Sequence, residues 1–148
     1  MHITIAAIGK MKASEEAKLV SSYLTRLPWR VEMREQEGSK FKGKADETKW
    51  LLEQIKGVEQ LYVLDERGKD IASKELASAM GEQIDGGIKR IGFIIGGADG
   101  LDQQQLPNGV RKVCFGKQTW PHMLVRVMLA EPLYRAHTIL TGHPYHRE

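Results

Sequence analysis

Short apolar runs alternate along this chain with segments whose apolar residues have helical spacing. The runs that suit β-strands occupy residues 3–8, 31–35, 60–64, 90–95 and 111–115. This alternation is typical of an α/β domain with a mostly parallel sheet, because a crossover helix is the usual way to connect parallel strands. We therefore predict a single α/β domain over residues 1–148, with helices on both faces of the sheet.

Polar residues that can cap helices precede three of the segments with helical spacing. Ser14, Asp46 and Ser73 have short side chains whose oxygen can accept a hydrogen bond from a free N–H of the first helical turn. They predict helices over residues 15–27, 46–56 and 73–84. Pro28 ends the first, Gly57 the second, and a glycine pair at 86–87 the third.

The last expected helix, over residues 121–140, is apolar around most of its circumference. A helix of that kind must be covered on more than one side, and one face of a sheet cannot do so. We therefore expect it to form the interface of a homodimer. Pro132 lies inside this helix, where it removes the hydrogen bond to Met128 and should kink the helix or end its first half.

The size and composition exclude several classes of protein. A chain of 148 residues has room for one domain with a real core, but not for a second module that grips a large substrate. No run approaches the roughly 18 apolar residues of a membrane span, and no signal peptide opens the chain, so we expect a cytoplasmic protein. The lone cysteine, Cys114, is expected to be a buried strand residue, and no cluster of metal ligands is present.

Positive charge is concentrated in the last quarter of the chain. The formal net charge is only +3, but residues 111–148 carry six Lys or Arg against two acidic residues, and four of the five histidines. This distribution favours an anionic partner, although a mixed solvated surface explains it too. The segment 37–44 is interpreted as a flexible surface loop with Phe41 exposed or folded back. The alternative is that Lys40, Lys42 and Lys44 contact phosphates.

Two further features are candidates for a binding site. An apolar strand runs directly into the glycine-rich turn 96–101, where glycines allow a ligand to approach the backbone closely. This turn lacks the Gly-x-Gly-x-x-Gly spacing of dinucleotide-binding folds, and a turn that merely needs positive φ explains it equally well. The tail 142–148 is dense in aromatic, imidazole and guanidinium groups, which suit stacking on a base and pairing with phosphate, although chain ends are often frayed.

Together these segments resemble the SPOUT-class RNA methyltransferases, and among them the bacterial large-subunit rRNA pseudouridine N3-methyltransferases. The resemblance runs from end to end of the chain. The matching segments are Ile5-Ala6-Ala7-Ile8-Gly9-Lys10, Tyr62-Val63-Leu64-Asp65 with Gly68, Ile95-Gly96-Gly97-x-x-Gly100-Leu101, Pro121-His122, Arg126-Val127, Glu131, Leu133-Tyr134-Arg135-Ala136 and His143-Pro144-Tyr145-His146-Arg147-Glu148. Two departures are Pro132, where relatives carry an ordinary helix residue, and Ala98-Asp99 within the glycine turn.

The resemblance implies a fold and a cofactor. The C-terminal part of the sheet should be threaded into a trefoil knot, a topology that no pattern in the sequence would suggest. Three loops of this knot should bind S-adenosyl-L-methionine, with Leu64 and Trp120 as apolar walls. The cofactor residues carried over to this chain are Leu64, Gly96, Phe115, Gly116, Lys117, Gln118, Thr119 and Trp120. Similar proteins are homodimers in which the tail of one subunit reaches the pocket of the other, and their substrate is 23S rRNA in the assembled ribosome, with no metal.

The chemistry of methyl transfer points to the C-terminal segments for catalysis. N3 of a pseudouridine carries a proton, so its lone pair becomes a good nucleophile only as that proton leaves. His146 or His143 is a candidate base, Arg135 or Arg147 a candidate cation for the developing charge, and Tyr145 a candidate to stack on the base. The catalytic prediction is therefore Arg135, Tyr145, His146 and Arg147.

Other polar residues of the last helix have simpler interpretations. Glu131 and Arg135 have i, i+4 spacing, so a simple ion pair between them is the alternative to a catalytic role for Arg135, and His122 is expected to cap or pack the pocket. Arg126 and Arg135 are nine positions apart, about half a turn around a helix, so they should serve different surfaces.

Two rival functions remain at this point. One is a ribosome-associated binding module that keeps the cofactor fold without catalysis, which binding of adenosylmethionine without methyl transfer would favour. The other is a nucleotide-dependent oxidoreductase, which the missing Gly-x-Gly-x-x-Gly spacing disfavours.

Overall fold

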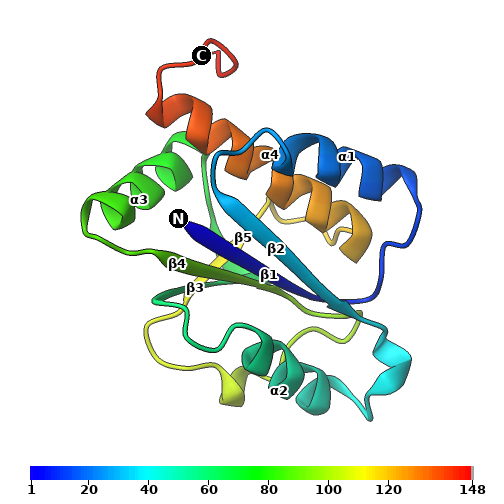
Figure 1. Cartoon of the computed structure of the whole chain (residues 1–148). Helices are drawn as coiled ribbons and strands as arrows, with labels where there is room; N and C mark the ends of the chain where they lie inside the picture. Colours follow the sequence, from blue (N-terminus) through cyan, green and yellow to red (C-terminus); the bar gives the residue numbers. More distant parts are fainter. Residues whose placement is uncertain (148) are drawn as a thin grey trace.

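A parallel sheet forms the centre of the molecule (Figure 1). The computed structural model describes residues 1–147, so that Glu148, the end of the last matching segment, lies outside the described residues. Within residues 1–147 the sheet has five strands in the order β2-β1-β4-β3-β5, and every pairing is parallel. The strands are β1 (His2–Ile8), β2 (Arg30–Gln36), β3 (Gln60–Asp70), β4 (Arg90–Ile95) and β5 (Arg111–Cys114). The predicted α/β class and the positions of the strands are confirmed.

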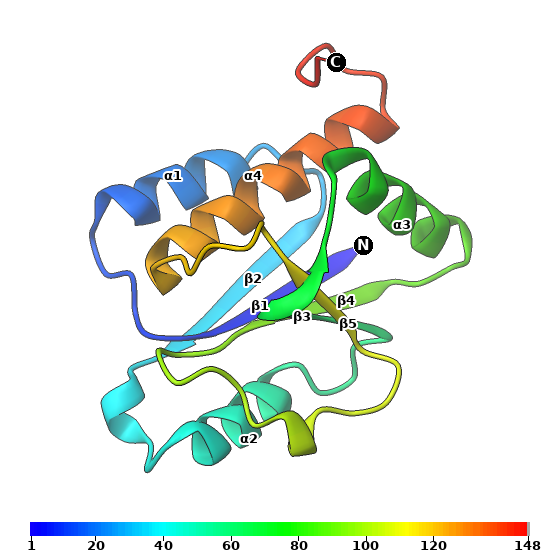
Figure 2. The same cartoon turned by 180° about the vertical axis from the view of Figure 1, so that it is seen from behind.

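Helices cover both faces of this sheet, as the sequence predicts. The α-helices are α1 (Glu15–Leu24), α2 (Lys44–Gln54), α3 (Ser73–Asp85) and α4 (His122–Leu140), with short 3₁₀ turns at Gly38–Lys40 and Gln103–Gln105. Figures 1 and 2 show α1, α4 and α3 on one face and α2 on the other. Helix α4 lies between α1 and α3 and packs against both.

The side chains of β1 explain how one sheet serves two cores. Ile5 and Ala7 are buried in the cluster beneath α1, α3 and α4, whereas Ala6 and Ile8 are buried in the cluster beneath α2. Successive residues of a strand point to opposite faces, so a central strand buried on both faces is apolar throughout. This is why residues 3–8 of β1 appear in the sequence as an apolar run interrupted only by the buried Thr4.

The helix starts agree only in part with the predicted caps. Ser14 caps α1, its Oγ accepting a hydrogen bond from the Ala17 N–H at 3.2 Å. The prediction for Asp46 is wrong, because α2 begins at Lys44 after Gly43, and Asp46 instead accepts from the Lys42 N–H at 3.2 Å. The prediction for Ser73 is also wrong, because Ser73 is the first helical residue and the preceding Ala72 makes no side-chain cap. Both residues lie within the first turn of their helices. In α2 the carboxylate of Asp46 still interacts favourably with the helix dipole there.

Helix α4 excludes one expectation about the last helix and leaves another as a prediction. Its apolar side chains pack largely within the chain, against α1, α3 and the sheet, and its place in a homodimer interface stays a prediction. The helix continues through Pro132 to Leu140, so Pro132 does not end it. Leu124 and Leu140 are the large apolar side chains of α4 that stay exposed, at 38% and 41%.

Strand β3 is longer than predicted and irregular at its end. Its register against β5 shifts between Leu64 and Lys69, since both of these residues pair with Val113. Gly68 makes this possible, because a Cβ there would lie 2.6 Å from the Val113 backbone N. The shift lifts residues 65–68 out of the regular ladder at the carboxyl edge of the sheet. Cys114, on β5, is buried as expected.

Candidate functional site

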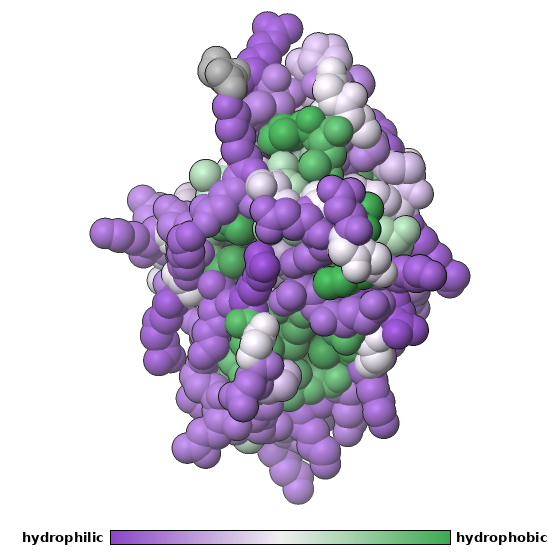
Figure 3. Space-filling model, turned by 90° about the vertical axis from the view of Figure 1, so that its left-hand side faces the viewer, coloured by the Kyte–Doolittle hydropathy of each residue, from purple (hydrophilic) through white to green (hydrophobic). Residues whose placement is uncertain are grey.

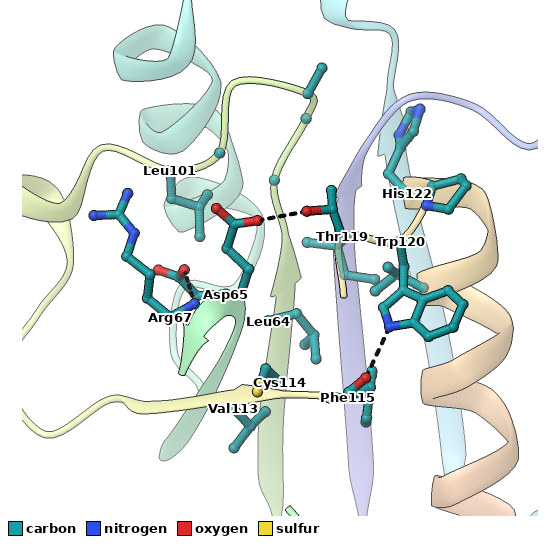
Figure 4. Close-up of a pocket in the computed structure, with 18 of the residues that line it drawn as sticks. Leu64, Asp65, Arg67, Leu101, Val113, Cys114, Phe115, Thr119, Trp120 and His122 are labelled. Carbon is teal, nitrogen blue, oxygen red and sulfur yellow. Dashed lines mark hydrogen bonds between the residues drawn. The ribbon is translucent and has the colours of Figure 1, made fainter. Parts of the chain in front are cut away.

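A cavity of about 550 Å³ opens at the carboxyl ends of β3, β4 and β5 and the start of α4 (Figure 4). Its walls come from three separate stretches of chain, which are residues 64–67, 95–101 with 103, and 113–122 except 117, together with Val125. The crevice beyond the carboxyl ends of parallel strands is where open α/β sheets bind ligands. The three loops expected to converge therefore do so.

The cavity includes nearly all of the cofactor residues expected from the sequence. Its lining contains Leu64, Gly96, Phe115, Gly116, Gln118, Thr119 and Trp120. Lys117 is the exception, because its side chain is exposed and does not line the cavity. Leu64, Phe115 and Trp120 supply apolar surface from three different positions around it (Figure 4).

The loop between β5 and α4 is held in shape by its own hydrogen bonds. Trp120 Nε1 donates to the Phe115 carbonyl at 2.9 Å, and Thr119 Oγ1 donates to Glu66 at 3.3 Å across the cavity mouth. The Gly116 N–H donates to Asp70 at 3.0 Å, with a φ of +84° that favours glycine. A ligand therefore meets a wall that is largely formed in advance.

The glycines of this turn are required for two different steric reasons, and the approach of a ligand to its backbone stays a prediction. Gly100 has a φ of +74° and open space around it, so it serves the turn itself. Gly96 has ordinary φ, but a Cβ there would lie 3.1 Å from the Gly100 carbonyl and from Leu101. Because this close packing leaves little room for a side chain at Gly96, the turn presents backbone atoms to the cavity at this position.

Carboxylates surround part of the cavity, and sequence analysis did not select them. Asp65 accepts hydrogen bonds from the Arg67 N–H at 3.0 Å and from Gln103 Nε2 at 2.7 Å. Glu66 and Asp99 line the same cavity and are exposed. Acidic residues directly after the predicted strand ends were the available signal. This rim favours a ligand with positive charge.

Arg126 is a buried residue that sequence analysis placed on a surface. Its side chain is fully buried and donates to the Ile8 carbonyl at 2.9 Å, to the Gly9 carbonyl, and to the His122 carbonyl at 3.2 Å. Burial lowers the pKa of Arg126, and the nearby carboxylate of Glu35 acts in the opposite direction. The side chain thus joins the end of β1 to the start of α4.

His122 shares this junction and lines the cavity. Its Nδ1 lies 3.1 Å from the Ile8 carbonyl oxygen, which can only accept, so Nδ1 carries the proton. The imidazole also packs on Gly9, where a Cβ would lie 2.7 Å from His122 Cε1. His122 therefore packs the cavity wall, as the sequence predicted.

Glu47, on α2, lies behind the glycine turn. It is 8% exposed, and its Oε2 has no hydrogen-bond partner among residues 1–147. That oxygen lies 2.9 Å from where a Cβ of Gly97 would be. Burial raises the pKa of Glu47, and the charge of Asp99 raises it further.

Three of the four residues predicted for catalysis, Arg135, Tyr145 and His146, form one network with Glu131. Arg135 donates to Glu131 Oε1 through Nε at 3.0 Å and through a second nitrogen, so the expected i, i+4 pair is present. The Tyr145 hydroxyl donates to the same Glu131 oxygen at 3.1 Å, and Arg135 lies 3.2 Å from His146 Nδ1. Because a guanidinium only donates, His146 Nδ1 accepts. Arg147 is exposed.

This network changes the chemistry of its members. Burial raises the pKa of Tyr145, and hydrogen bonds to Tyr23 and Glu131 raise it further, so the hydroxyl stays protonated. Pairing with Glu131 raises the pKa of Arg135 and keeps it charged. His146 cannot accept a proton at Nδ1 while Arg135 occupies that nitrogen.

Within one chain the C-terminal network and the cavity do not meet. His122 lines the cavity at the first turn of α4, whereas Arg135 lies 13 residues along the helix, roughly 20 Å at 1.5 Å per residue. The tail follows the far end of the helix (Figure 1). The structure thus groups the two predicted sets separately, one at each end of α4.

A parallel sheet with a cavity at its carboxyl edge is the arrangement typical of α/β proteins that bind small organic ligands. The chain belongs to the SPOUT methyltransferase family, whose model, described as "Predicted SPOUT methyltransferase", matches residues 1–146. It is therefore a methyltransferase, and the predicted family and enzyme class are confirmed. The oxidoreductase alternative is set aside by this membership.

Curated relatives match the whole chain. A protein of Paramagnetospirillum magneticum named "Ribosomal RNA large subunit methyltransferase H" is 43% identical over 99% of both chains. A protein of Paracoccus denitrificans with the same name is 42% identical over the full length of both. Among solved structures, a probable methylase family protein from Haemophilus influenzae Rd KW20 superposes with a TM-score of 0.60, covering 99% of this chain and 70% of that one. At 10% identity this likeness supports the fold alone.

The described part of the chain contains neither a membrane-spanning helix nor a cluster of metal ligands. No helix within residues 1–147 has the length and apolar character needed to cross a bilayer. The same residues contain no group of three or more His, Cys, Asp or Glu placed to hold a metal ion.

Proposed function

We propose that this protein transfers a methyl group from S-adenosyl-L-methionine to N3 of a pseudouridine in the 23S rRNA of the assembled ribosome. The observation that carries the proposal is the convergence of three loops on one cavity at the carboxyl edge of the sheet. Its volume of about 550 Å³ lies within the range of small-molecule sites. The names of the full-length relatives support rRNA of the large subunit as the substrate.

The residues of the cavity fit this cofactor. Leu64, Phe115 and Trp120 offer apolar surface for the adenine ring, and the turn at Gly96 presents bare backbone for hydrogen bonds. Gly116, Gln118 and Thr119 contribute further lining, and Lys117 acts from the rim outside the cavity. The acidic rim suits a ligand that carries a sulfonium and an amino group. When bound, the cofactor supplies an electrophilic methyl carbon.

The catalytic groups come from a second copy of the chain in this proposal. Arg135, Tyr145, His146 and Arg147 lie too far along α4 to serve their own cavity, so the neighbour's tail must reach it. There the charge of Arg135 or Arg147 stabilises the negative charge that develops as N3 loses its proton, and Tyr145 stacks on the base. One C–S bond breaks, one C–N bond forms, and the N3 proton leaves to His146, another group or water. Release of His146 Nδ1 from Arg135 is required if His146 is the base.

The surface of α4 supports a homodimer. Leu124 is 38% exposed, and residues 124, 128, 131 and 135 share one face of the helix, so an apolar stripe leads to the Glu131–Arg135 pair. Figure 3 shows further apolar patches between polar side chains, on the side of the molecule that carries α3. Ile84 of α3 and Leu140 of α4 are among the large apolar residues left exposed. A second copy would bury such surface.

The proposed function also implies a chain topology and a cellular compartment. We infer one SPOUT domain over residues 1–148, with the chain after β4 threaded into a trefoil knot. The pairing of β5 with β3 and the return of α4 between α1 and α3 are compatible with that threading. A protein that modifies assembled ribosomes belongs in the cytoplasm.

Mass spectrometry of rRNA nucleosides tests the proposed reaction. Ribosomes from a strain lacking the gene are incubated with the protein and isotopically labelled adenosylmethionine. We expect one labelled methyl group on a pseudouridine of 23S rRNA, and none with protein carrying Gly96→Val, whose added side chain would enter the packed turn. Binding of adenosylmethionine without label in any nucleoside would instead favour a binding module.

A further inference from the structure

Two loops beside the cavity carry lysines that have no ionic partner. Lys10 follows β1, Lys40 and Lys42 lie between β2 and α2, and Lys44 is the first residue of α2. All four side chains are exposed, and none of them forms an ion pair with another residue in the range 1–147. We call these four residues the lysine edge.

Contacts with residues of the cavity and of the glycine turn place both loops next to the cavity. Lys10 adjoins Gly9, which packs on the cavity residue His122. Cβ atoms added at Gly38 and at Gly97 would both meet the side chains of Ile8 and Glu47, so the start of the second loop lies beside the glycine turn. The two loops are joined by an ion pair of 3.4 Å between Lys12 and Glu37. Figure 1 shows the second loop, in cyan, beside the end of β1.

The second loop is anchored, which keeps its lysines pointing to solvent. The Phe41 ring packs against Trp50 with centroids 5.8 Å apart, and the Lys42 N–H donates to Asp46 at 3.2 Å. The loop is therefore folded back at Phe41, while Lys40 and Lys42 on either side of it remain exposed. An anchored loop loses less conformational entropy when it binds a partner.

The cavity lining and the lysine edge differ in charge. The lining carries three carboxylates, Asp65, Glu66 and Asp99, against one guanidinium, that of Arg67, whereas the lysine edge is basic. A phosphate backbone is repelled by the rim and attracted by the edge. A strand held at the edge keeps its phosphates outside while one base enters the cavity.

We propose that the lysine edge binds the phosphate backbone of the rRNA strand next to the target nucleotide, which rests on the function proposed above. Lysine binds phosphate as a point charge without regard to base sequence, and phosphate contacts position a nucleic acid. A membrane fits less well, because the loop keeps its aromatic residue packed inward. The RNA then lies between the lysine edge of the subunit that owns the cavity and the tail of the partner.

A charge-matched pair of double variants tests this assignment. One carries Lys40→Ala and Lys42→Ala. The control carries Lys56→Ala and Lys89→Ala, which are also exposed but follow α2 and precede β4, at the opposite edge of the sheet. Methylation of ribosomes is measured over a range of ribosome and salt concentrations, and adenosylmethionine affinity is measured separately.

We expect KM for ribosomes to rise about tenfold in the K40A/K42A variant, with kcat and cofactor affinity close to wild type. The slope of log(kcat/KM) against log[salt] should become shallower by roughly 1 to 2, since each phosphate contact contributes about 0.7–0.9. Lys40→Arg with Lys42→Arg should retain the wild-type KM, because the charge is kept. The control variant should match wild type.

The proposal is overturned if K40A/K42A keeps the wild-type KM and salt slope, or if the control variant loses as much. Failure of the methylation reaction itself is separable. If wild-type protein methylates no ribosome, direct binding of ribosomes by the same variants still decides whether the lysine edge contacts RNA. Equal binding by wild type and K40A/K42A across the salt range counts against the assignment.

Discussion

Glu47 is a buried carboxyl group whose position couples α2 to the glycine turn of the cavity. One of its oxygens lies against Gly97, and no cation faces it among the described residues. An ionised carboxylate there faces both burial and the charge of Asp99. The protonated form is therefore the one that suits the folded protein.

This gives a prediction for the pH dependence of stability. Because the pKa of Glu47 in the folded state is raised above its ordinary value of 4.5, its favourable contribution is complete below that value and is lost as the pH rises through the folded pKa. Glu47→Gln mimics the protonated form, so its free energy of unfolding relative to wild type should grow between about pH 4 and about pH 7. Urea unfolding at both pH values measures it, with the exposed Glu53→Gln as control. A constant difference would contradict the prediction.

Gly9 is the residue at which backbone conformation and cavity packing coincide. It has a φ of +95°, and an added Cβ would lie 2.7 Å from His122 Cε1. Gly57 has a similar φ of +88° but open space around it. Substitutions at these two glycines therefore separate the free-energy cost of the positive φ from the cost of the contact with His122.

We expect Gly57→Ala to lower the free energy of unfolding by about 1–2 kcal/mol, the cost of a left-handed backbone. Gly9→Ala should cost more and should also weaken adenosylmethionine binding several-fold, because His122 is pushed from the cavity wall. Chemical unfolding and calorimetric titration measure the two effects. Equal stabilities of the two variants, with unchanged cofactor affinity in both, would contradict the prediction. They would show that the His122 side chain moves aside without a cost in free energy.

At the scale of elements, Arg126 connects the end of β1 to the start of α4. Its guanidinium donates to the carbonyl of Ile8, the last residue of β1, and to the carbonyl of Gly9, the residue after it. Buried carbonyls without donors cost about 1–3 kcal/mol each. The position of His122, and so one wall of the cavity, depends on the same junction.

Arg126→Met should therefore lower the free energy of unfolding by roughly 1–3 kcal/mol, since it removes the donor of the Gly9 carbonyl and leaves the Ile8 carbonyl with His122 Nδ1 alone. Arg126→Lys keeps one charged donor and should lose less. Urea denaturation measures both, and the exposed Arg30→Met provides a control with the same chemical change at the surface. A methionine variant as stable as wild type would mean that water replaces the guanidinium.

The elements also show which features the sequence could predict. The strands were predictable because burial on both faces leaves runs such as 5–8 and 91–95 without polar side chains. The extension of β3 past Leu64 was not, because it depends on a register shift against β5 that only Gly68 permits. The caps at Asp46 and Ser73 were misplaced by up to three residues, since several polar residues near a helix start satisfy the same pattern.

At the scale of the whole molecule, long-range packing decides what local patterns leave open. The apolar circumference of α4 indicated a dimer interface, yet α1 and α3 of the same chain cover most of it. Arg126 looked like a surface residue because its acceptors lie more than a hundred positions earlier in the chain. The cofactor loops were predictable only through resemblance to a family, because nothing local shows that residues 64, 96 and 115 meet.

The separation of cavity and tail makes the proposed site a property of two chains. If the tail acts on the partner's cavity, one subunit with a defective cavity and one with a defective tail should together form one complete site. Gly96→Val makes the cavity defective, and ending the chain at Pro144 makes the tail defective. Each variant alone should be nearly inactive, whereas the truncated chain should bind adenosylmethionine within a few-fold of wild type.

Mixing the two variants in equal amounts, with exchange of subunits, distinguishes action between chains from action within a chain. Random pairing makes half of the dimers mixed, and each mixed dimer has one intact site of two, so activity should recover to about one quarter of wild type. A tail that served its own cavity would leave the mixture as inactive as its components. Cross-linking of the mixture confirms that mixed dimers have formed, so an inactive mixture with mixed dimers present would reject catalysis by the partner's tail.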